Sequence, residues 1–241
     1  MARVALVTGG TRGIGAAVSQ SLQAAGYVVA ATYAGNVEAA KAFSSRTGIA
    51  SYRWDVGDFD ACAAGVRSVE ASLGPVDILV NNAGIVRDST LHKMTRPQWD
   101  VVIRTNLDGL FNMCRQVIDG MRARGYGRII NVSSVNGQKG QFGQTNYSAA
   151  KAGELGFTKA LALETARLGI TVNAICPGYI HTEMLDAVPP DVLERSILPQ
   201  IPVGRLGRPE EIARAVVFLA AEGAAFITGA TLSINGGQHM I

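Results

Sequence analysis

The chain is poor in cysteine and histidine. Its three cysteines, Cys62, Cys114 and Cys176, are an odd number and lie far apart, without a Cys-x-x-Cys pair. This argues against a disulfide framework and favours small buried hydrophobic side chains. The three histidines do not have the spacing of metal ligands. We therefore expect neither disulfide bonds nor a metal site.

The chain also lacks long hydrophobic runs and a strong excess of either charge. The longest apolar run near its C-terminal end, residues 215–221, has seven residues, whereas a membrane span needs about 20. The first residues lead directly into a strand pattern, with no signal-peptide pattern. A formal net charge of +3 with mixed signs is too small to indicate nucleic-acid binding. We expect a cytoplasmic protein that binds neither membranes nor nucleic acid.

Strand and helix patterns alternate along the whole chain. With 241 residues, 48% of them hydrophobic, one α/β domain spanning residues 1–241 is expected. Apolar runs predict strands at residues 4–7, 27–31, 52–55, 77–80, 128–132, 171–175 and 231–234. Helical spacing predicts helices at residues 14–25, 61–73, 99–122 and from about residue 147. This alternation is typical of a Rossmann-type doubly wound parallel sheet, here with about seven strands and helices on both faces.

A glycine-rich turn follows the first predicted strand. Gly9, Gly13 and Gly15 lie between that strand and the first helix, where glycines let a pyrophosphate approach the backbone at a helix N-terminus. Their spacing departs from the common Gly-x-Gly-x-x-Gly pattern, and a tight turn between strand and helix needs glycine in any case. The position between strand and helix favours a dinucleotide site.

The residues around this turn favour NADPH over NADH. An NAD site places a carboxylate near the end of the second strand, but the first one here is Glu38. Arg12 lies inside the glycine turn, where it could bind a 2′-phosphate through two hydrogen bonds. The alternative is that Arg12 is a solvated loop residue and that another cation, such as Lys41, binds the phosphate.

Tyr147 and Lys151 lie one helical turn apart and therefore share a helix face. A lysine ammonium favours the phenolate of a neighbouring tyrosine, so it lowers the tyrosine pKa. Such a phenol can donate a proton to a carbonyl oxygen, and the Ser134 hydroxyl could stabilise charge on the same oxygen. The pair alone is weak evidence, because most Tyr-x-x-x-Lys pairs are a partly buried tyrosine and a solvated lysine. Together with the glycine turn, it predicts a carbonyl reductase.

Four motifs in this order make the chain resemble the short-chain dehydrogenase/reductase family over nearly its whole length. They are Thr8-Gly9-x-x-x-Gly13-x-Gly15, Asn81-Asn82-Ala83-Gly84, the set Asn106, Ser134, Tyr147 and Lys151, and Pro177-Gly178. The resemblance implies that the third motif is a catalytic tetrad. In it Lys151 also holds the nicotinamide ribose, and Asn106 anchors a water that relays protons. The alternative for Asn106 is a structural role in its helix.

The resemblance also implies an NADPH site that includes the glycine turn and the ends of several strands. Asp55 and Val56 would flank the adenine, and Thr182 would bind the nicotinamide carboxamide. The full implied set is Gly9, Thr11, Arg12, Gly13, Ile14, Gly15, Asp55, Val56, Asn82, Ala83, Gly84, Ile85, Tyr147, Lys151, Pro177, Gly178, Ile180 and Thr182.

Within this family, residues 116–121, 135–147 and 235–240 resemble the acetoacetyl-CoA reductases of polyhydroxybutyrate synthesis. The resemblance implies an acyl-CoA thioester substrate, a homotetramer, and an acyl pocket formed by Asp88, Gln141, Phe142, Gln144 and Tyr179. Each of the five could instead be a loop residue without ligand contact. The proline-rich segment of residues 179–203 is a candidate substrate lid, and the alternative is an ordinary surface insertion.

Two other functions stay open. The 3-oxoacyl-(acyl-carrier-protein) reductases of fatty-acid synthesis share the same tetrad, so only flanking residues separate them from the acetoacetyl-CoA reductases. A non-catalytic nucleotide sensor could also be built on the same fold, because a fold does not determine a function.

Overall fold

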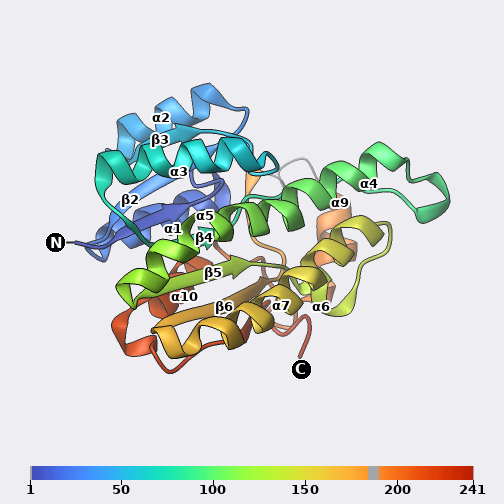
Figure 1. Cartoon of the computed structure of the whole chain (residues 1–241). Helices are drawn as coiled ribbons and strands as arrows, with labels where there is room; N and C mark the ends of the chain where they lie inside the picture. The colour runs from blue at the N-terminus through green and yellow to red at the C-terminus, as the bar shows by residue number, and fades with distance from the viewer. Residues whose placement is uncertain (1, 184–189, 241) are drawn as a thin grey trace.

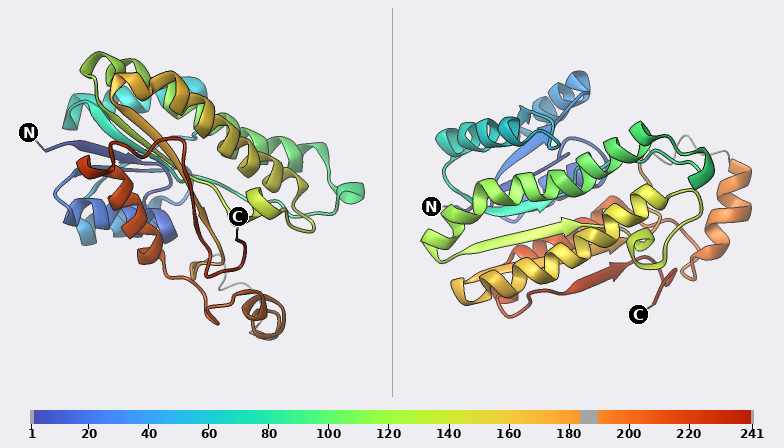
Figure 2. Two further views of the ribbon diagram at one scale, coloured as in Figure 1. Left: turned by 90° about the horizontal axis from the view of Figure 1, so that it is seen from below. Right: turned by 45° about the vertical axis from the view of Figure 1, so that its right-hand side comes forward.

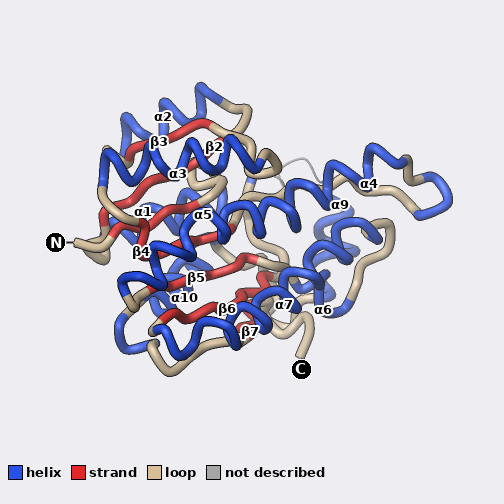
Figure 3. Tube along the Cα trace, in the orientation of Figure 1, coloured by secondary structure: helices blue, strands red, loops and turns tan. Residues whose placement is uncertain are grey.

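A seven-stranded parallel sheet forms the centre of the molecule (Figures 1 and 3). The computed structural model describes residues 2–183 and 190–240. The strand order is β3-β2-β1-β4-β5-β6-β7, and every pair of neighbours is parallel. The strands are β1 (Val4–Val7), β2 (Val28–Tyr33), β3 (Ala50–Arg53), β4 (Val76–Asn81), β5 (Gly127–Val132), β6 (Ile170–Pro177) and β7 (Thr231–Ile234). The predicted doubly wound α/β fold is confirmed.

Helices cover both faces of the sheet. One hydrophobic cluster joins α1 and α10 to one face, and a second joins α3, α5 and α7 to the other. The view along the sheet in Figure 2 shows these two layers. The principal helices are α1 (Gly13–Ala24), α2 (Val37–Thr47), α3 (Phe59–Leu73), α4 (Arg96–Ile103), α5 (Gly109–Arg124), α7 (Thr145–Thr165) and α10 (Pro209–Ala220).

The strand order reverses its direction between β1 and β4. From β1 the chain builds outward through β2 and β3, then returns to place β4 on the other side of β1. In open α/β sheets a ligand binds outside the carboxyl ends of the strands at such a point. The carboxyl ends lie toward the right in Figure 1, near α4, α6 (Val135–Lys139) and α9 (Pro190–Val192).

Two sequence predictions need correction. The third strand spans Ala50–Arg53 instead of residues 52–55, and the indole ring of Trp54, the next residue, packs on α3, where a Cβ at Gly65 would lie 2.5 Å from it. The helix predicted over residues 99–122 is a composite: α4, a π-helical turn (Arg104–Asp108) and α5 follow one another. The π turn contains Asn106 and changes the direction of its side chain relative to a regular helix.

The candidate lid follows the carboxyl end of β6. Residues 184–189 of it lie outside the described part. Residues 190–200 form short helical turns that stand off from the sheet (Figure 2). Ile180, which precedes these turns, and Gly207, which follows them, form an isolated parallel β-bridge. Among the helices described, none is long and apolar enough to span a membrane.

Candidate active site

The glycine turn leads from β1 into α1 at the point where the strand order reverses. Gly9 has a φ of 62° and Gly13 a φ of 49°, a region that favours glycine. A Cβ at Gly15 would lie 2.1 Å from the carbonyl oxygen of Gly9, so only glycine fits there. The cap residue Arg12 forms no side-chain cap bond, and the first turn of α1 contains no acidic residue. The helix N-terminus therefore suits an anion.

Thr8 and Asn82 join this turn to the end of β4. The Thr8 hydroxyl oxygen accepts hydrogen bonds from the backbone N–H groups of Asn82 (2.9 Å) and Ala83 (3.0 Å). The Asn82 side-chain amide donates to the carbonyl oxygen of Thr8 at 3.0 Å and to that of Gly9 at 3.3 Å. The loops after β1 and β4 are thus fixed to each other at the reversal point.

The segment after β6 approaches the same turn. The Thr182 methyl group would lie 3.4 Å from a Cβ at Gly13, so this residue adjoins the glycine turn as the dinucleotide prediction requires. Gly178 packs so closely on Asn235 that a Cβ would lie 2.8 Å from its Cα. Pro177 is the last residue of β6 rather than the first residue after it.

Three arginine side chains lie in the glycine turn or near the carboxyl ends of β2 and β3, which we call the β2–β3 edge. Arg12 Nη1 lies 3.4 Å from Glu183 Oε2, and both side chains are exposed. Arg104 Nη2 lies 3.3 Å from Asp55 Oδ2. Arg53 donates through Nε to the carbonyl oxygen of Ala34, just past the end of β2 (3.1 Å). This last arginine was not singled out from the sequence.

The helix α7 places Tyr147 and Lys151 on one face. Lys151 is 3% exposed, and its Nζ lies 5.8 Å from the centroid of the Tyr147 ring. Nζ donates to the carbonyl oxygen of Val132 at 2.9 Å and to Glu154 Oε1 at 2.7 Å. Burial alone would lower the Lys151 pKa, but the Glu154 carboxylate, with a contribution from Tyr147, raises it. The lysine is therefore kept protonated beside the phenol.

Asn106 lies in the π turn and faces the loop after β4. Its Oδ1 accepts from the backbone N–H of Ile85 (2.8 Å), and its Nδ2 donates to the carbonyl oxygen of Ile85 (2.9 Å). A Cβ at Gly84 would lie 3.1 Å from Asn106 Oδ1 and 3.7 Å from Lys151 Nζ. Glycine at this position therefore lets the loop pass close to both Asn106 and Lys151.

Ser134 caps the short helix α6 directly after β5. Its Oγ accepts from the backbone N–H of Asn136 at 3.1 Å, which leaves the hydroxyl proton for another partner. The Asn136 side chain donates to Gln144 Oε1 (3.0 Å), and Gln144 Nε2 donates to Asp88 Oδ2 (3.0 Å). This polar chain links the Ser134 helix to the loop after β4.

The residues predicted for the acyl pocket do not all come together. Tyr179 is near Asp88: burial raises the Tyr179 pKa, and the Asp88 carboxylate adds to the effect. Tyr179 lines a pocket of about 480 Å³ with residues that include Ile201 and Val203. In contrast, Phe142 is 87% exposed. Gln141, in the loop after α6, accepts a hydrogen bond from the exposed Lys139 at the end of that helix.

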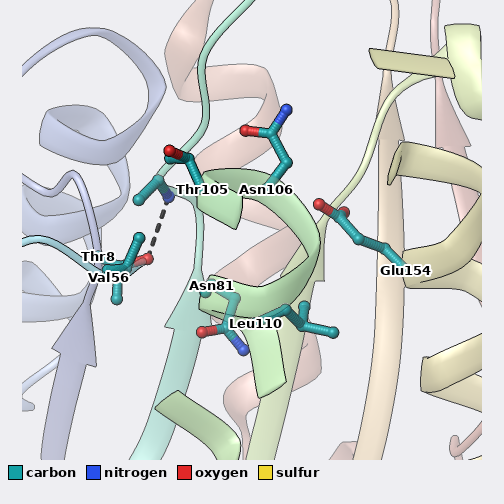
Figure 4. Close-up of a pocket in the computed structure, with 9 residues that line it drawn as sticks. Thr8, Val56, Asn81, Thr105, Asn106, Leu110 and Glu154 are labelled. Carbon is teal, nitrogen blue, oxygen red and sulfur yellow. Dashed lines mark hydrogen bonds between the residues drawn. The ribbon is translucent and has the colours of Figure 1, made fainter. Parts of the chain in front are cut away.

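A second, small pocket lies beside the π turn (Figure 4). Its lining includes Thr8 and Val56 on one side and Asn106 and Glu154 on the other. Figure 4 shows the Glu154 carboxylate reaching from α7 toward Asn106. Burial raises the pKa of Glu154 to about 7, although Lys151 lowers it. Sequence reasoning missed Glu154, because a glutamate three residues after a lysine usually forms an exposed helix pair.

The described residues suit a dinucleotide. The uncapped N-terminus of α1 offers N–H groups to a pyrophosphate, and the glycine positions leave its approach open. Thr182 adjoins the glycine turn, and the Gly84 loop lies against Lys151. A nucleotide turn thus shares one sheet edge with a Tyr–Lys pair and a capping serine. The fold and site together define an oxidoreductase that uses a nicotinamide cofactor.

Comparisons with known proteins identify the family. A family model described as "Enoyl-(Acyl carrier protein) reductase" matches residues 9–239. The chain is 67% identical to the acetoacetyl-CoA reductase of Shinella zoogloeoides over 100% of both chains. It is also 67% identical to the acetoacetyl-CoA reductase of Rhizobium meliloti (strain 1021) over 99% of both. A 3-oxoacyl-(acyl-carrier-protein) reductase of Vibrio harveyi is 45% identical, covering 99% of this chain and 98% of the relative. The chain belongs to the short-chain dehydrogenase/reductase family.

Proposed function

We propose that the protein reduces acetoacetyl-CoA to (R)-3-hydroxybutyryl-CoA with NADPH and supplies polyhydroxybutyrate synthesis. The observation that carries this proposal is the 67% identity, over the full chain, to relatives named acetoacetyl-CoA reductase. The relative named as a carrier-protein reductase is less similar, at 45%. The enzyme would work in the cytoplasm, which cell fractionation would test.

The proposed reaction is the reduction of a ketone rather than of a carbon–carbon double bond. Tyr147 would donate a proton to the nascent alkoxide, and Ser134 would hold the same oxygen through its free hydroxyl proton. Lys151 would favour proton donation by the phenol and bind the nicotinamide ribose. These groups suit an oxygen that gains negative charge. The cofactor supplies the hydride when bound.

NADPH is the proposed cofactor because arginines lie near the carboxyl end of β2 and the chain that leaves β2 carries no carboxylate before Glu38. Arg12 and Arg53 both lie near this edge, and the Arg12 guanidinium can take up a 2′-phosphate in place of Glu183. The residues that would hold the rest of the cofactor are the glycine turn, the loop after β4 and the segment of residues 177–182.

We further propose a single domain over residues 1–241, with a lid at residues 179–203 and a homotetrameric assembly. Tyr179 and Ile201 of the proposed lid line one pocket with Ile234 and Asn235, which supports closure of this segment over a substrate. Gly156 on α7 has nothing within 4 Å of its Cβ position, so another helix could approach there. Sedimentation of wild type and a Gly156→Phe variant tests the tetramer, since a bulky side chain would dissociate it.

A substrate comparison tests the proposed reaction. Initial rates would be measured with NADPH on acetoacetyl-CoA, on longer 3-oxoacyl-CoA thioesters and on the matching carrier-protein thioesters. We expect the highest kcat/KM on acetoacetyl-CoA. A strong preference for the carrier-protein thioesters would instead assign the enzyme to fatty-acid synthesis.

A further inference from the structure

Glu154 is a buried carboxylate beside the proposed catalytic lysine, and neither the resemblance nor the proposed reaction gives it a role. The residue is 2% exposed and lies on α7, three positions after Lys151. Its Oε1 accepts a hydrogen bond from Lys151 Nζ at 2.7 Å. Its other oxygen, Oε2, is buried and has no hydrogen-bond partner in the described structure.

Stability alone is a poor explanation for this residue. Burying an ion pair costs desolvation energy that the pair often fails to recover, and a well-packed apolar side chain is frequently as good or better. An unpaired buried carboxylate oxygen adds to that cost. A glutamate at this position therefore indicates a task that needs an ionisable group.

Glu154 borders a small polar pocket next to the proposed catalytic residues. Glu154 lines the pocket beside the π turn together with Asn106, Asn81 and Thr8 (Figure 4). The pocket has room for about one water molecule, and its lining offers polar partners for it. A proton on Glu154 can therefore exchange with a water on one side and with Lys151 on the other.

The geometry of Lys151 connects Glu154 to Tyr147. An ammonium has three N–H donors, and two of them bind Val132 and Glu154. The third is available to another partner, and the centroid of the Tyr147 ring lies 5.8 Å from Nζ. A negative charge on Glu154 cancels part of the lysine charge that Tyr147 experiences, and a proton on Glu154 restores it.

We propose that Glu154 is a positioning residue whose protonation state sets how readily Tyr147 donates its proton. When Glu154 is protonated, the charge of Lys151 acts on the phenol undiminished, and ketone reduction is fast. When Glu154 is ionised, it compensates Lys151, the phenol is a weaker acid, and reduction is slow. This inference rests on the proposed reduction of a 3-oxoacyl thioester.

The proton balance closes without a further reactant. NADPH would supply the hydride when bound, and the carbonyl oxygen would gain the Tyr147 proton. Lys151 returns a proton to the phenolate, and Glu154 or the pocket water returns one to Lys151. Solvent water finally restores the proton on Glu154, so each turnover consumes one proton.

The direction of the pH effect follows from the groups that face Glu154. These are Lys151 and Tyr147 on α7 and Cys176 on β6; the nearby Asn81 and Asn106 side chains do not titrate. Burial raises the Glu154 pKa to about 7, so the residue loses its proton as the pH rises through neutrality. The rate of reduction should fall over the same interval.

The test compares wild type with Glu154→Gln, which keeps the shape and a hydrogen bond but cannot ionise. If the protonated form reduces the ketone about tenfold faster than the ionised form, we expect the wild-type kcat at saturating NADPH to fall about fivefold between about pH 6 and about pH 8. In Glu154→Gln this fall should be absent, with NADPH affinity changed less than about threefold. Glu164→Gln, an exposed site on the same helix, serves as the control and should behave as wild type.

An unchanged pH profile in Glu154→Gln overturns the proposal, and so does a loss of stability without a change in the profile. If Glu154→Gln does not fold, infrared titration of wild type decides. A buried carboxyl band that loses its proton at the midpoint of the kcat profile supports the proposal, and the absence of such a band overturns it. Failure of the proposed function is a separate outcome, in which wild type does not reduce acetoacetyl-CoA. The pH profiles of wild type and Glu154→Gln would then be compared on the 3-oxoacyl thioester that wild type does reduce.

Discussion

The side chain of Asn106 binds the backbone of Ile85 through both its oxygen and its nitrogen, at 2.8 and 2.9 Å. The two peptide units on either side of the Ile85 Cα are thus held by one side-chain amide, and neither can rotate without breaking a hydrogen bond. Asn106 is thereby the residue that sets the position of the loop after β4 against Lys151. Its contribution to a proton relay stays a prediction, because this side chain is already engaged with Ile85.

Replacing Asn106 by alanine should loosen this loop. The Ile85 N–H and C=O would lose their partners, which costs about 1–3 kcal/mol for a buried group left unsatisfied. We expect a lower melting temperature and weaker NADPH binding, measured by thermal denaturation and by fluorescence titration of the cofactor. A variant with lost activity but unchanged cofactor affinity and stability would contradict the positioning role and favour the relay.

Replacing Tyr147 by phenylalanine should abolish reduction without loss of the cofactor. The ring stays on the α7 face, but the proton donor is gone, and positioned acid–base groups contribute about 10²–10⁴-fold to rate. NADPH oxidation in the presence of acetoacetyl-CoA would measure the loss, and cofactor fluorescence would measure binding. Oxidation at the wild-type rate would remove Tyr147 from its proposed role and favour a different proton donor.

Much of the fold follows from local patterns. A short apolar run whose residues are all buried, such as β1, indicates a central strand of a parallel sheet. The glycine turn requires a left-handed backbone, and the structure has it at Gly9 and Gly13. The resemblance assigned Thr182 and Gly13 to one cofactor site, and the Thr182 methyl group lies 3.4 Å from a Cβ placed at Gly13.

Other features depend on long-range packing and could not be predicted. The π turn at Asn106 changes backbone hydrogen bonding while leaving the hydrophobic spacing almost intact. The close packing of the Trp54 ring on Gly65 joins the end of β3 to α3, a contact that local patterns do not reveal. The partnership of Glu154 with Lys151 is invisible in sequence, because an exposed pair and a buried pair have the same spacing.

The cofactor preference can be tested at Arg12. Arg12→Ala removes a guanidinium at the glycine turn and should weaken NADPH by about tenfold or more, while NADH changes little, because only NADPH carries the 2′-phosphate. Glu183→Gln should act oppositely, since it releases Arg12 from its carboxylate neighbour at 3.4 Å. Dissociation constants for both cofactors would be measured for each variant.

Arg53→Ala is the comparison that locates the phosphate. If NADPH affinity falls with Arg53→Ala and not with Arg12→Ala, the phosphate lies at the β2–β3 edge and the sequence interpretation of Arg12 is wrong. A ratio of NADPH to NADH affinity that neither variant changes would exclude both arginines.

The polar chain from Asp88 through Gln144 to Asn136 predicts a difference between two glutamines on one loop. Gln144→Ala breaks hydrogen bonds to both neighbours, so the helix that Ser134 caps loses its link to the loop after β4. We expect kcat/KM to fall about tenfold, equivalent to about 1.4 kcal/mol. Gln141→Ala removes only a contact with Lys139 and should leave kcat/KM nearly unchanged. Equal losses in the two variants would instead place both glutamines against the substrate.

The cysteines offer a check of the fold around the site. Cys62, Cys114 and Cys176 have essentially no exposed side chain, and burial raises the pKa of the first two to about 12. Only the thiolate reacts with alkylating or disulfide reagents, so the native protein should consume none of a thiol reagent near neutral pH and react at all three sites in denaturant. The number of thiols labelled with time measures this. Rapid labelling of Cys176 in the native state would show that β6, which leads into the proposed nicotinamide segment, opens to solvent.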